Sequence, residues 1–254
     1  MPGMDISIWG FAALAAAAAL VGFSKTAVSG ANTVSLAVFA AVLPARESTG
    51  VLLPLLLVGD VIAVLTYRRH AHWPTLLRMF PAVVAGIVAG TVFMAWADDT
   101  VVRRSIGAIL LLMVAVTLWR RRAADGDGPG EAPGARAGRY AAQSYGVLGG
   151  FTTMVANAGG PVMSLYLLSA GFRKLGFLGT SAWFFLVVNA FKVPFMVGLG
   201  LIGADSLRLD AMLAALVVAG AFAGRAVAAR IDQRLFDRLV IVATTAGGLQ
   251  LLLR

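Results

Sequence analysis

The chain has 254 residues, of which 59% are hydrophobic and 13% are charged, and it has no cysteine. Soluble domains are typically about 45–50% apolar, so this composition excludes an ordinary soluble domain and indicates an integral membrane protein. The lack of cysteine excludes disulfides and thiolate metal sites. The net charge of +9 does not indicate a nucleic-acid partner, because the basic residues are scattered between apolar runs and fit orientation by cytoplasmic Lys and Arg.

Apolar runs divide the chain into two similar halves. The first half, residues 1–119, has an apolar run from Ile6 to Phe23, a polar break at 24–33, a short apolar piece ending at Leu43, and longer runs at about 49–67, 75–97 and 101–119. The second half, residues 140–254, has a break at 152–161, a short piece ending near Gly171, and longer runs at about 175–203, 207–229 and 235–253. The longer runs are near the roughly 20 residues that cross hydrocarbon, so each predicts a membrane helix.

The two ends of the first half are also informative. No basic leader precedes the first apolar run, so we interpret this run as the first membrane helix and not as a cleavable signal peptide. Residues 120–139 begin with three arginines and continue with Asp, Gly and Pro. This composition predicts a flexible cytoplasmic linker between the halves.

The halves align with each other, which predicts an internal duplication. At an offset of 128, Gly22 matches Gly150, and at an offset of 134 residues 82–120 match 216–254 without a gap. Glycines recur at a spacing of four in the second alignment, at Gly86, Gly90, Gly220 and Gly224. Small residues at this spacing let helices approach closely, so we interpret these glycines as packing positions rather than substrate contacts.

The polar breaks are predicted to carry the function of each half. In the second break, Gly159, Gly160 and Pro161 remove helix propensity and one backbone donor. Lipid offers no hydrogen bonds, so non-helical backbone at membrane depth survives only when it is buried in protein or lines a wet cavity. We therefore expect 24–33 and 152–161 to be unwound, and we expect the helix after each break to aim its N-terminal N–H groups at an anion.

The distribution of Lys and Arg decides between two topologies. If each half crosses the membrane five times, thirteen basic residues lie on the side of the linker, and five lie outside, namely Arg46, Arg103, Arg104, Arg208 and Arg254. If the short pieces are re-entrant, the count becomes nine on each side. The positive-inside rule favours five crossings, an odd number that inverts one half relative to the other. The sequence thus predicts an all-α membrane protein with two inverted repeats of about five segments each and short interrupted helices in corresponding positions, which is typical of transporters.

Lys192 and Asp60 are charged residues deep in apolar runs. A Lys at the centre of a membrane helix costs about 2.5–3.5 kcal/mol on insertion scales, so a specific partner is expected. One candidate partner is an anionic substrate, with Asn189 on the same helix face, and the other is Asp60 in the third run of the first half. Asp60 itself is either a proton or cation site or only a partner for Lys192, and the sequence leaves both open.

The breaks add polar side chains to this candidate site. They are Ser24, Lys25, Asn32 and Thr33 in the first break and Thr152, Thr153 and Asn157 in the second. With Gly159, Gly160, Pro161, Asn189 and Lys192, they predict a small anion site near the middle of the membrane. Two alternatives stay open, namely that these groups only satisfy the broken backbone and that Lys25 snorkels to the lipid headgroups.

Motifs of catalysis and metal binding are absent from the sequence. There is no Gly-x-Ser-x-Gly, His-Glu-x-x-His or Walker sequence, so we expect no enzyme activity, no cofactor and no ATP-driven transport by this chain alone. His70 and His72 have no third ligand cluster, and Trp73 follows them, so an interfacial loop is favoured over a metal site. Arg225 is interpreted as a snorkelling residue or as one that pairs within the bundle.

Four features together point to a known family: the duplication, Gly150-Phe151 before Gly159-Gly160-Pro161, Asn189-x-x-Lys192, and Gly220-x-x-x-Gly224 before a basic loop. By these features, the sequence resembles the sulfite exporter TauE/SafE family over almost the whole chain. This family is also described as toluene sulfonate uptake permeases. The resemblance implies a multi-pass carrier of the bacterial inner membrane for sulfite, sulfoacetate, thiosulfate and other organosulfonates, with Asn157, Gly159, Gly160, Pro161, Asn189 and Lys192 in its site. The first break departs from this pattern, because Ala31-Asn32-Thr33 stands in place of Gly-Gly-Pro, so a strictly symmetric site is not expected.

We therefore predict a secondary transporter, in the exporting direction, of small sulfur-containing anions such as sulfite or organosulfonates. The alternative is a non-transporting membrane component that serves in assembly or anchoring. The expected partners are the lipid bilayer, a small anionic substrate, and protons or another coupling ion, without nucleic acid. Both a monomer and a homo-oligomer fit the sequence.

Overall fold

The computed structural model describes residues 6–27, 32–126, 135–172, 174–227 and 233–253, and all regular secondary structure in these ranges is helical. The α-helices in these ranges are α1 (Ile8–Thr26), α2 (Asn32–Val42), α3 (Ala45–Tyr67), α4 (Trp73–Trp96), α5 (Asp99–Gly126), α6 (Ala135–Ala156), α7 (Gly159–Ser169), α8 (Lys174–Gly198), α9 (Ala204–Val227) and α10 (Gln233–Leu253), with a 3-10 helix η1 (Arg68–His70). α5 and α6 extend into the stretch 120–139 that was predicted as a linker, and residues 127–134 lie outside the described ranges.

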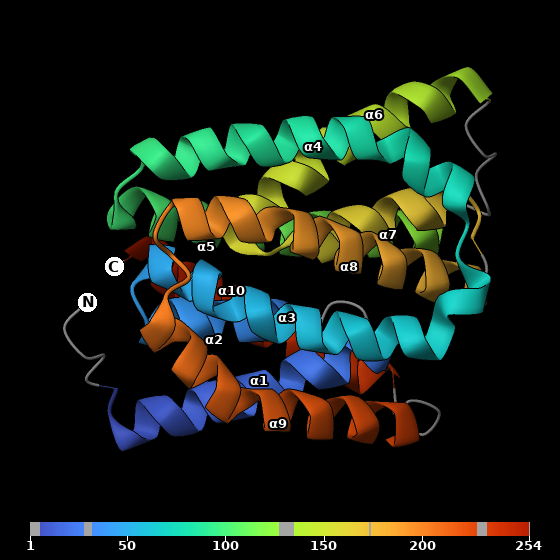
Figure 1. Cartoon of the computed structure of the whole chain (residues 1–254). Coiled ribbons are helices and arrows are strands. Elements are labelled where there is room, and N and C mark those ends of the chain that lie inside the picture. The colour runs from blue at the N-terminus through green and yellow to red at the C-terminus, as the bar shows by residue number, and fades with distance from the viewer. Residues whose placement is uncertain (1–5, 28–31, 127–134, 173, 228–232, 254) are drawn as a thin grey trace.

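Figure 1 shows a bundle whose helices run along roughly one direction. α4 packs along α6 on one side of the bundle, α1 packs along α9 on the opposite side, and α3 and α8 lie between these two pairs. α5 and α10 pack against each other, while the short helices α2 and α7 fold back against α1 and α6. α2 also packs against α3, and α7 against α8, so that each short helix contacts the central pair.

Five helices in the described ranges are long and apolar enough to cross a membrane. They are α1, α3 together with η1, α4, α8 and α9. Large apolar side chains are exposed on their outward faces, such as Leu65, Leu77, Met212 and Phe222. Such surfaces are a liability in water but suit contact with lipid tails. The predicted all-helical membrane architecture is confirmed at this level.

Local sequence explains where two of the helices begin, and the membrane setting explains why three helices continue through an internal proline. Ser7 caps α1 by accepting a hydrogen bond from the Gly10 N–H at 3.0 Å, and Asp98 accepts one from the Val101 N–H at 2.7 Å at the start of α5. Prolines lie inside α3, α4 and α8, at Pro54, Pro81 and Pro194. Membrane helices tolerate such prolines where neighbouring groups satisfy the freed carbonyls.

Two glycines that match in the sequence make the same contact in the two halves. A Cβ atom at Gly22 in α1 would overlap the Val217 carbonyl of α9, and one at Gly150 in α6 would overlap the Val83 carbonyl of α4. Val83 and Val217 match at the same offset of 134 as the predicted packing glycines. Of the predicted packing glycines, Gly86 would place a Cβ on the Val147 carbonyl of α6, and Gly220 would place one on the Ala19 carbonyl of α1. Their interpretation as packing positions is therefore confirmed, and the close helix pair occurs twice.

At one position of α9 the two halves differ in polarity, because Asp210 stands where α4 has an apolar residue. Its match in α4 is Leu76, which is fully buried in the core. Asp210 is 5% exposed, and among the described residues neither of its carboxylate oxygens has a hydrogen-bond partner. A carboxyl group that is removed from water without a partner is destabilising.

Replacing Asp210 by Leu is therefore expected to raise the free energy of unfolding by about 1–3 kcal/mol, because the unpartnered carboxyl is removed. Thermal unfolding in detergent micelles would measure this. The matched control is Leu76→Asp, which should lower the melting temperature. A lower melting temperature of the Asp210→Leu variant would contradict the expectation, and a more stable variant that no longer transports would assign Asp210 a role in the carrier.

Candidate functional site

The second break is shorter than the sequence indicated. Thr152 and Thr153 belong to the last turn of α6, and Gly159, Gly160 and Pro161 form the first turn of α7, so that only Asn157 and Ala158 are non-helical. The expected unwinding of 152–161 is wrong in extent, because proline is tolerated in the first turn of a helix, where its missing N–H has no partner to lose. Asn157 has a φ of 51°, a left-handed conformation that Asn adopts more readily than most residues.

Lys192 of α8 holds this break in place. Its Nζ donates to the Thr153 carbonyl at 2.7 Å and to Asn157 Oδ1 at 2.6 Å, and its side chain is completely buried. Asn157 Nδ2 donates in turn to the Thr49 carbonyl of α3 at 2.9 Å. The side chain of Asn157 therefore links α3 of the first half to α8 of the second.

Asp60 pairs with a different lysine from the one expected. Its Oδ1 accepts from Lys25 Nζ of α1 at 2.5 Å, and its Oδ2 accepts from Asn189 Nδ2 of α8 at 2.7 Å. The ion pair with Asp60, one of the two alternatives for Lys192, is not formed, because Asn189 lies between the two side chains and α1 ends beside Asp60. Lys25 Nζ also lies 4.7 Å from the centre of the Phe185 ring, so the ammonium faces the interior of the protein and does not snorkel.

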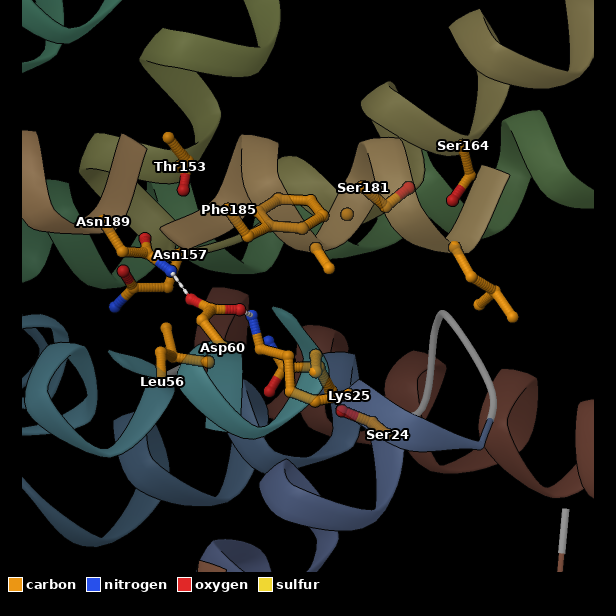
Figure 2. Close-up of a pocket in the computed structure, with 15 residues that line it drawn as sticks. Ser24, Lys25, Leu56, Asp60, Thr153, Asn157, Ser164, Ser181, Phe185 and Asn189 are labelled. Atoms are coloured by element: carbon orange, nitrogen blue, oxygen red, sulfur yellow. Dashed lines mark hydrogen bonds and ion pairs between the residues drawn. The ribbon is translucent and has the colours of Figure 1, made fainter. Parts of the chain in front are cut away.

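A cavity of about 70 Å³ lies beside the Lys25–Asp60 pair. At roughly 10–15 Å³ for each water in this measure, it has room for a few waters or one small oxyanion. Figure 2 shows that its polar side chains come from both halves, with Lys25 and Asp60 on one side and Thr153, Ser181 and Asn189 on the other. Its lining consists of Ser24, Lys25, Asn32, Leu56, Asp60, Ala63, Thr153, Asn157, Gly160, Ser164, Leu178, Ser181, Ala182, Phe185 and Asn189.

The cavity brings together many of the predicted site residues but not all. Lys192, Thr152, Thr33, Gly159 and Pro161 do not line it. Lys192 is separated from the cavity by Thr153, Asn157 and Asn189. Its ammonium donates to the first two and lies 3.4 Å from Asn189 Oδ1. The polar groups therefore form two layers, an inner one at the cavity and an outer one around the Lys192 ammonium.

Ser164 and Ser181 are lining residues that the sequence reasoning missed. One signal was available, because Ser181, Phe185 and Asn189 are spaced by four residues and so share one face of α8. No comparable pattern marks Ser164, which lies one turn after Pro161 in α7. A single serine in an apolar helix is common in membrane proteins, so its position alone indicated nothing.

Matching positions of the two halves face the cavity with different chemistry. At the offset of 128, Lys25 matches Thr153 and Asn32 matches Gly160, and all four line the cavity. The cation is thus contributed by the first half only, while the second half offers a hydroxyl and a backbone without a side chain. The Oδ1 atom of Asn32 is buried and has no hydrogen-bond partner among the described residues. Residues 28–31 of the first break lie outside the described ranges.

The remaining candidates lie away from this cavity. His72 Nδ1 is 2.8 Å from Thr75 Oγ1, and its backbone N–H donates to Thr180 Oγ1 at 3.0 Å, so that this loop docks on α8. His70 and Arg225 are exposed. At the end of α1, Ser24, which does line the cavity, donates to the Val21 carbonyl at 2.9 Å, and Thr26 donates to the Ala221 carbonyl at 2.8 Å.

The geometry of the site suits binding of a small anion. Lys25 supplies an ammonium, three serines and one threonine supply hydroxyl groups, and Leu56, Ala63 and Phe185 supply an apolar wall. Because Asp60 occupies the ammonium, an anion must compete with this carboxylate for Lys25. The site therefore requires an ion pair that opens.

A comparison with protein families gives one match. The family model described as sulfite exporter TauE/SafE matches residues 14–251. No curated protein and no solved structure matches the chain. The matched range includes every residue that lines the cavity.

Proposed function

Because the chain belongs to the sulfite exporter TauE/SafE family, we propose that it is a secondary transporter that exports small sulfur-containing anions such as sulfite or organosulfonates. The observation that carries this proposal is the cavity between the two halves, which holds the partly buried ammonium of Lys25 beside hydroxyl and amide groups. Its volume of about 70 Å³ suits a small oxyanion better than a bulky aromatic sulfonate.

The course of the chain supports an inverted-repeat architecture for this carrier. In Figure 1, the colours run in opposite directions along α3 and α8, and also along α4 and α9. With the predicted linker on the cytoplasmic side, this direction matches the topology that the positive-inside rule favours. We propose that the two halves are inverted repeats in the bacterial inner membrane, and that the cavity opens alternately to each side.

The residues of the site divide into three proposed roles. The first role is binding of the anion, by Lys25, Asn189, Thr153, Asn157, Ser24, Asn32 and the α7 N-terminus at Gly160. Lys192 binds the Thr153 carbonyl and the Asn157 amide and thereby keeps this binding layer in place. Thr33, Thr152, Gly159 and Pro161 shape the ends of the helices that surround the cavity.

Removing both members of the ion pair tests the anion site. The double substitution Lys25→Gln, Asp60→Asn leaves no unpaired charge, and we expect it to weaken anion binding at least about tenfold, because the ammonium is lost. The measurement is the thermal shift of the detergent-solubilised protein with sulfite, thiosulfate and methanesulfonate, followed by uptake of labelled anion into proteoliposomes.

The matched control is Arg208→Gln, which removes the exposed partner of Asp205 at the start of α9 and should bind as the wild type does. A wild-type protein that shows neither a shift nor uptake with any of these anions contradicts the proposal. That result would favour the alternative, a non-transporting membrane component.

A further inference from the structure

We infer that Asp60 couples transport to protons: when an anion takes the Lys25 ammonium, Asp60 takes up one proton, and the anion and the proton cross together. This inference rests on the proposed function, since it concerns the same cavity. It identifies the coupling ion and the group that binds it, and it follows from how the two carboxylate oxygens of Asp60 are held.

Asp60 and the anion compete for one cation. The carboxylate has two partners, Lys25 Nζ on Oδ1 and Asn189 Nδ2 on Oδ2, and both lie at the cavity wall. Figure 2 shows the carboxylate between these two side chains. An anion in the cavity that pairs with Lys25 therefore takes the only ion-pair partner that Asp60 has among the described residues.

Within the part of the chain that the structure describes, no other charged group forms an ion pair with Asp60. Lys192 of α8 is turned to the Thr153 carbonyl and Asn157 Oδ1, with Asn189 between it and Asp60. α9 faces this part of α3 with Val217, and α2 has no titratable residue. Arg46 and Glu47 lie in the first turn of α3, where Asp99 of α5 contacts Arg46 and pairs with Arg103, and Arg68, Arg69 and His70 of η1 follow the end of α3.

Burial makes the proton necessary. Asp60 is 0% exposed, and a buried carboxylate that loses its cation is strongly unfavourable, so the group neutralises instead. The O–H bond forms on Oδ1, the atom that Lys25 releases, with a proton that a hydronium ion delivers from the side to which the cavity is open, and one neutral water is left behind. Oδ2 continues to accept the hydrogen bond from Asn189, and no bond of the anion changes.

After this exchange, the charges around the Lys25–Asp60 pair cancel in only two states of the carrier. The empty carrier holds the closed pair of ammonium and carboxylate, and the loaded carrier holds ammonium, monoanion and protonated Asp60. A carrier with an anion but no proton would bury an unpaired carboxylate, and this state should not reorient. Anion and proton are therefore obligatorily coupled at one to one, and the direction of net flux follows the sum of the two gradients.

The experiment follows protons and anions in the same proteoliposomes. The probe is labelled methanesulfonate, a monoanion that takes up no proton near neutral pH, with pyranine inside the vesicles and the membrane potential clamped by K⁺ and valinomycin. For the wild type we expect one proton per methanesulfonate. The variant Asp60→Asn should lose net uptake about tenfold or more, because its empty site buries the Lys25 charge unpaired, but it should keep anion–anion exchange.

Two further variants keep the test decisive. Asp60→Glu retains a carboxyl group and should retain one proton per anion, while Asp205→Asn removes an exposed carboxylate at the start of α9 and should behave as the wild type. Anion uptake without proton movement, or proton coupling that survives in Asp60→Asn, overturns the inference and leaves the proposed function standing. No uptake of methanesulfonate by the wild type overturns both.

Discussion

Replacing Lys192 by methionine is expected to reduce anion transport by at least about tenfold and to lower the melting temperature. Methionine has a similar length but no donors, so the Thr153 carbonyl and Asn157 Oδ1 lose the hydrogen bonds that Lys192 gives them at 2.7 and 2.6 Å. Leaving a buried acceptor unsatisfied costs about 1–3 kcal/mol, and both acceptors lie at the non-helical break beside the cavity. The break should then lose its fixed shape and, with it, the placement of Asn157 and Thr153 at the cavity wall.

A double-mutant cycle separates this positioning role from direct contact with the anion. If Lys192 acts by holding Asn157, the pair Lys192→Met with Asn157→Leu should bind anion no more weakly than Lys192→Met alone. If the ammonium itself contacts the anion, the two losses should add. Affinity comes from the thermal shift titrated with thiosulfate, and flux comes from proteoliposomes.

The control for this variant is Val197→Ile on the exposed face of the same helix, which should change neither binding nor stability. A Lys192→Met protein that transports at the wild-type rate would remove Lys192 from the mechanism. It would also show that the break keeps its shape without a donor from α8.

The helices were predictable because lipid demands long apolar runs. The runs at 49–67 and 75–97 became α3 and α4, and the short pieces after the breaks became α2 and α7. The extent of the second break was not predictable from composition, because Gly159, Gly160 and Pro161 weaken a helix in its interior but are tolerated in its first turn. Only two residues interrupt the helix, namely Asn157, which has a left-handed backbone, and Ala158.

The sequence predicted most of the residues of the candidate site, but it did not predict which lysine pairs with Asp60. Lys25, Asp60, Asn189 and Lys192 stand out because each is polar in an apolar segment. Which lysine reaches Asp60 depends on where α1 ends relative to α3, and that is set by packing of α1 on α9 rather than by local sequence. Lys25 thus became the cation of the cavity, while Lys192 became the donor that holds the break.

Substituting Gly22 or Gly150 by alanine is expected to destabilise the protein by about 1–3 kcal/mol or more in each case. A Cβ at Gly22 would overlap the Val217 carbonyl, and one at Gly150 would overlap the Val83 carbonyl. Both obstacles are backbone atoms of a partner helix, so a side-chain rotation cannot relieve them, and the helices must separate. Thermal unfolding in detergent micelles measures the loss.

The control is Gly198→Ala at the end of α8, where an added Cβ meets no atom within 4 Å and stability should stay unchanged or rise slightly. The two test variants should lose similar amounts, because α1 on α9 and α6 on α4 make the same contact at matching positions. Separation of either helix pair should also disturb the cavity, since α1 carries Lys25 and α6 carries Thr153. A loss at Gly150 without a loss at Gly22 would mean that the end of α1 is free to shift, and Lys25 could then not be held against Asp60 by helix packing alone.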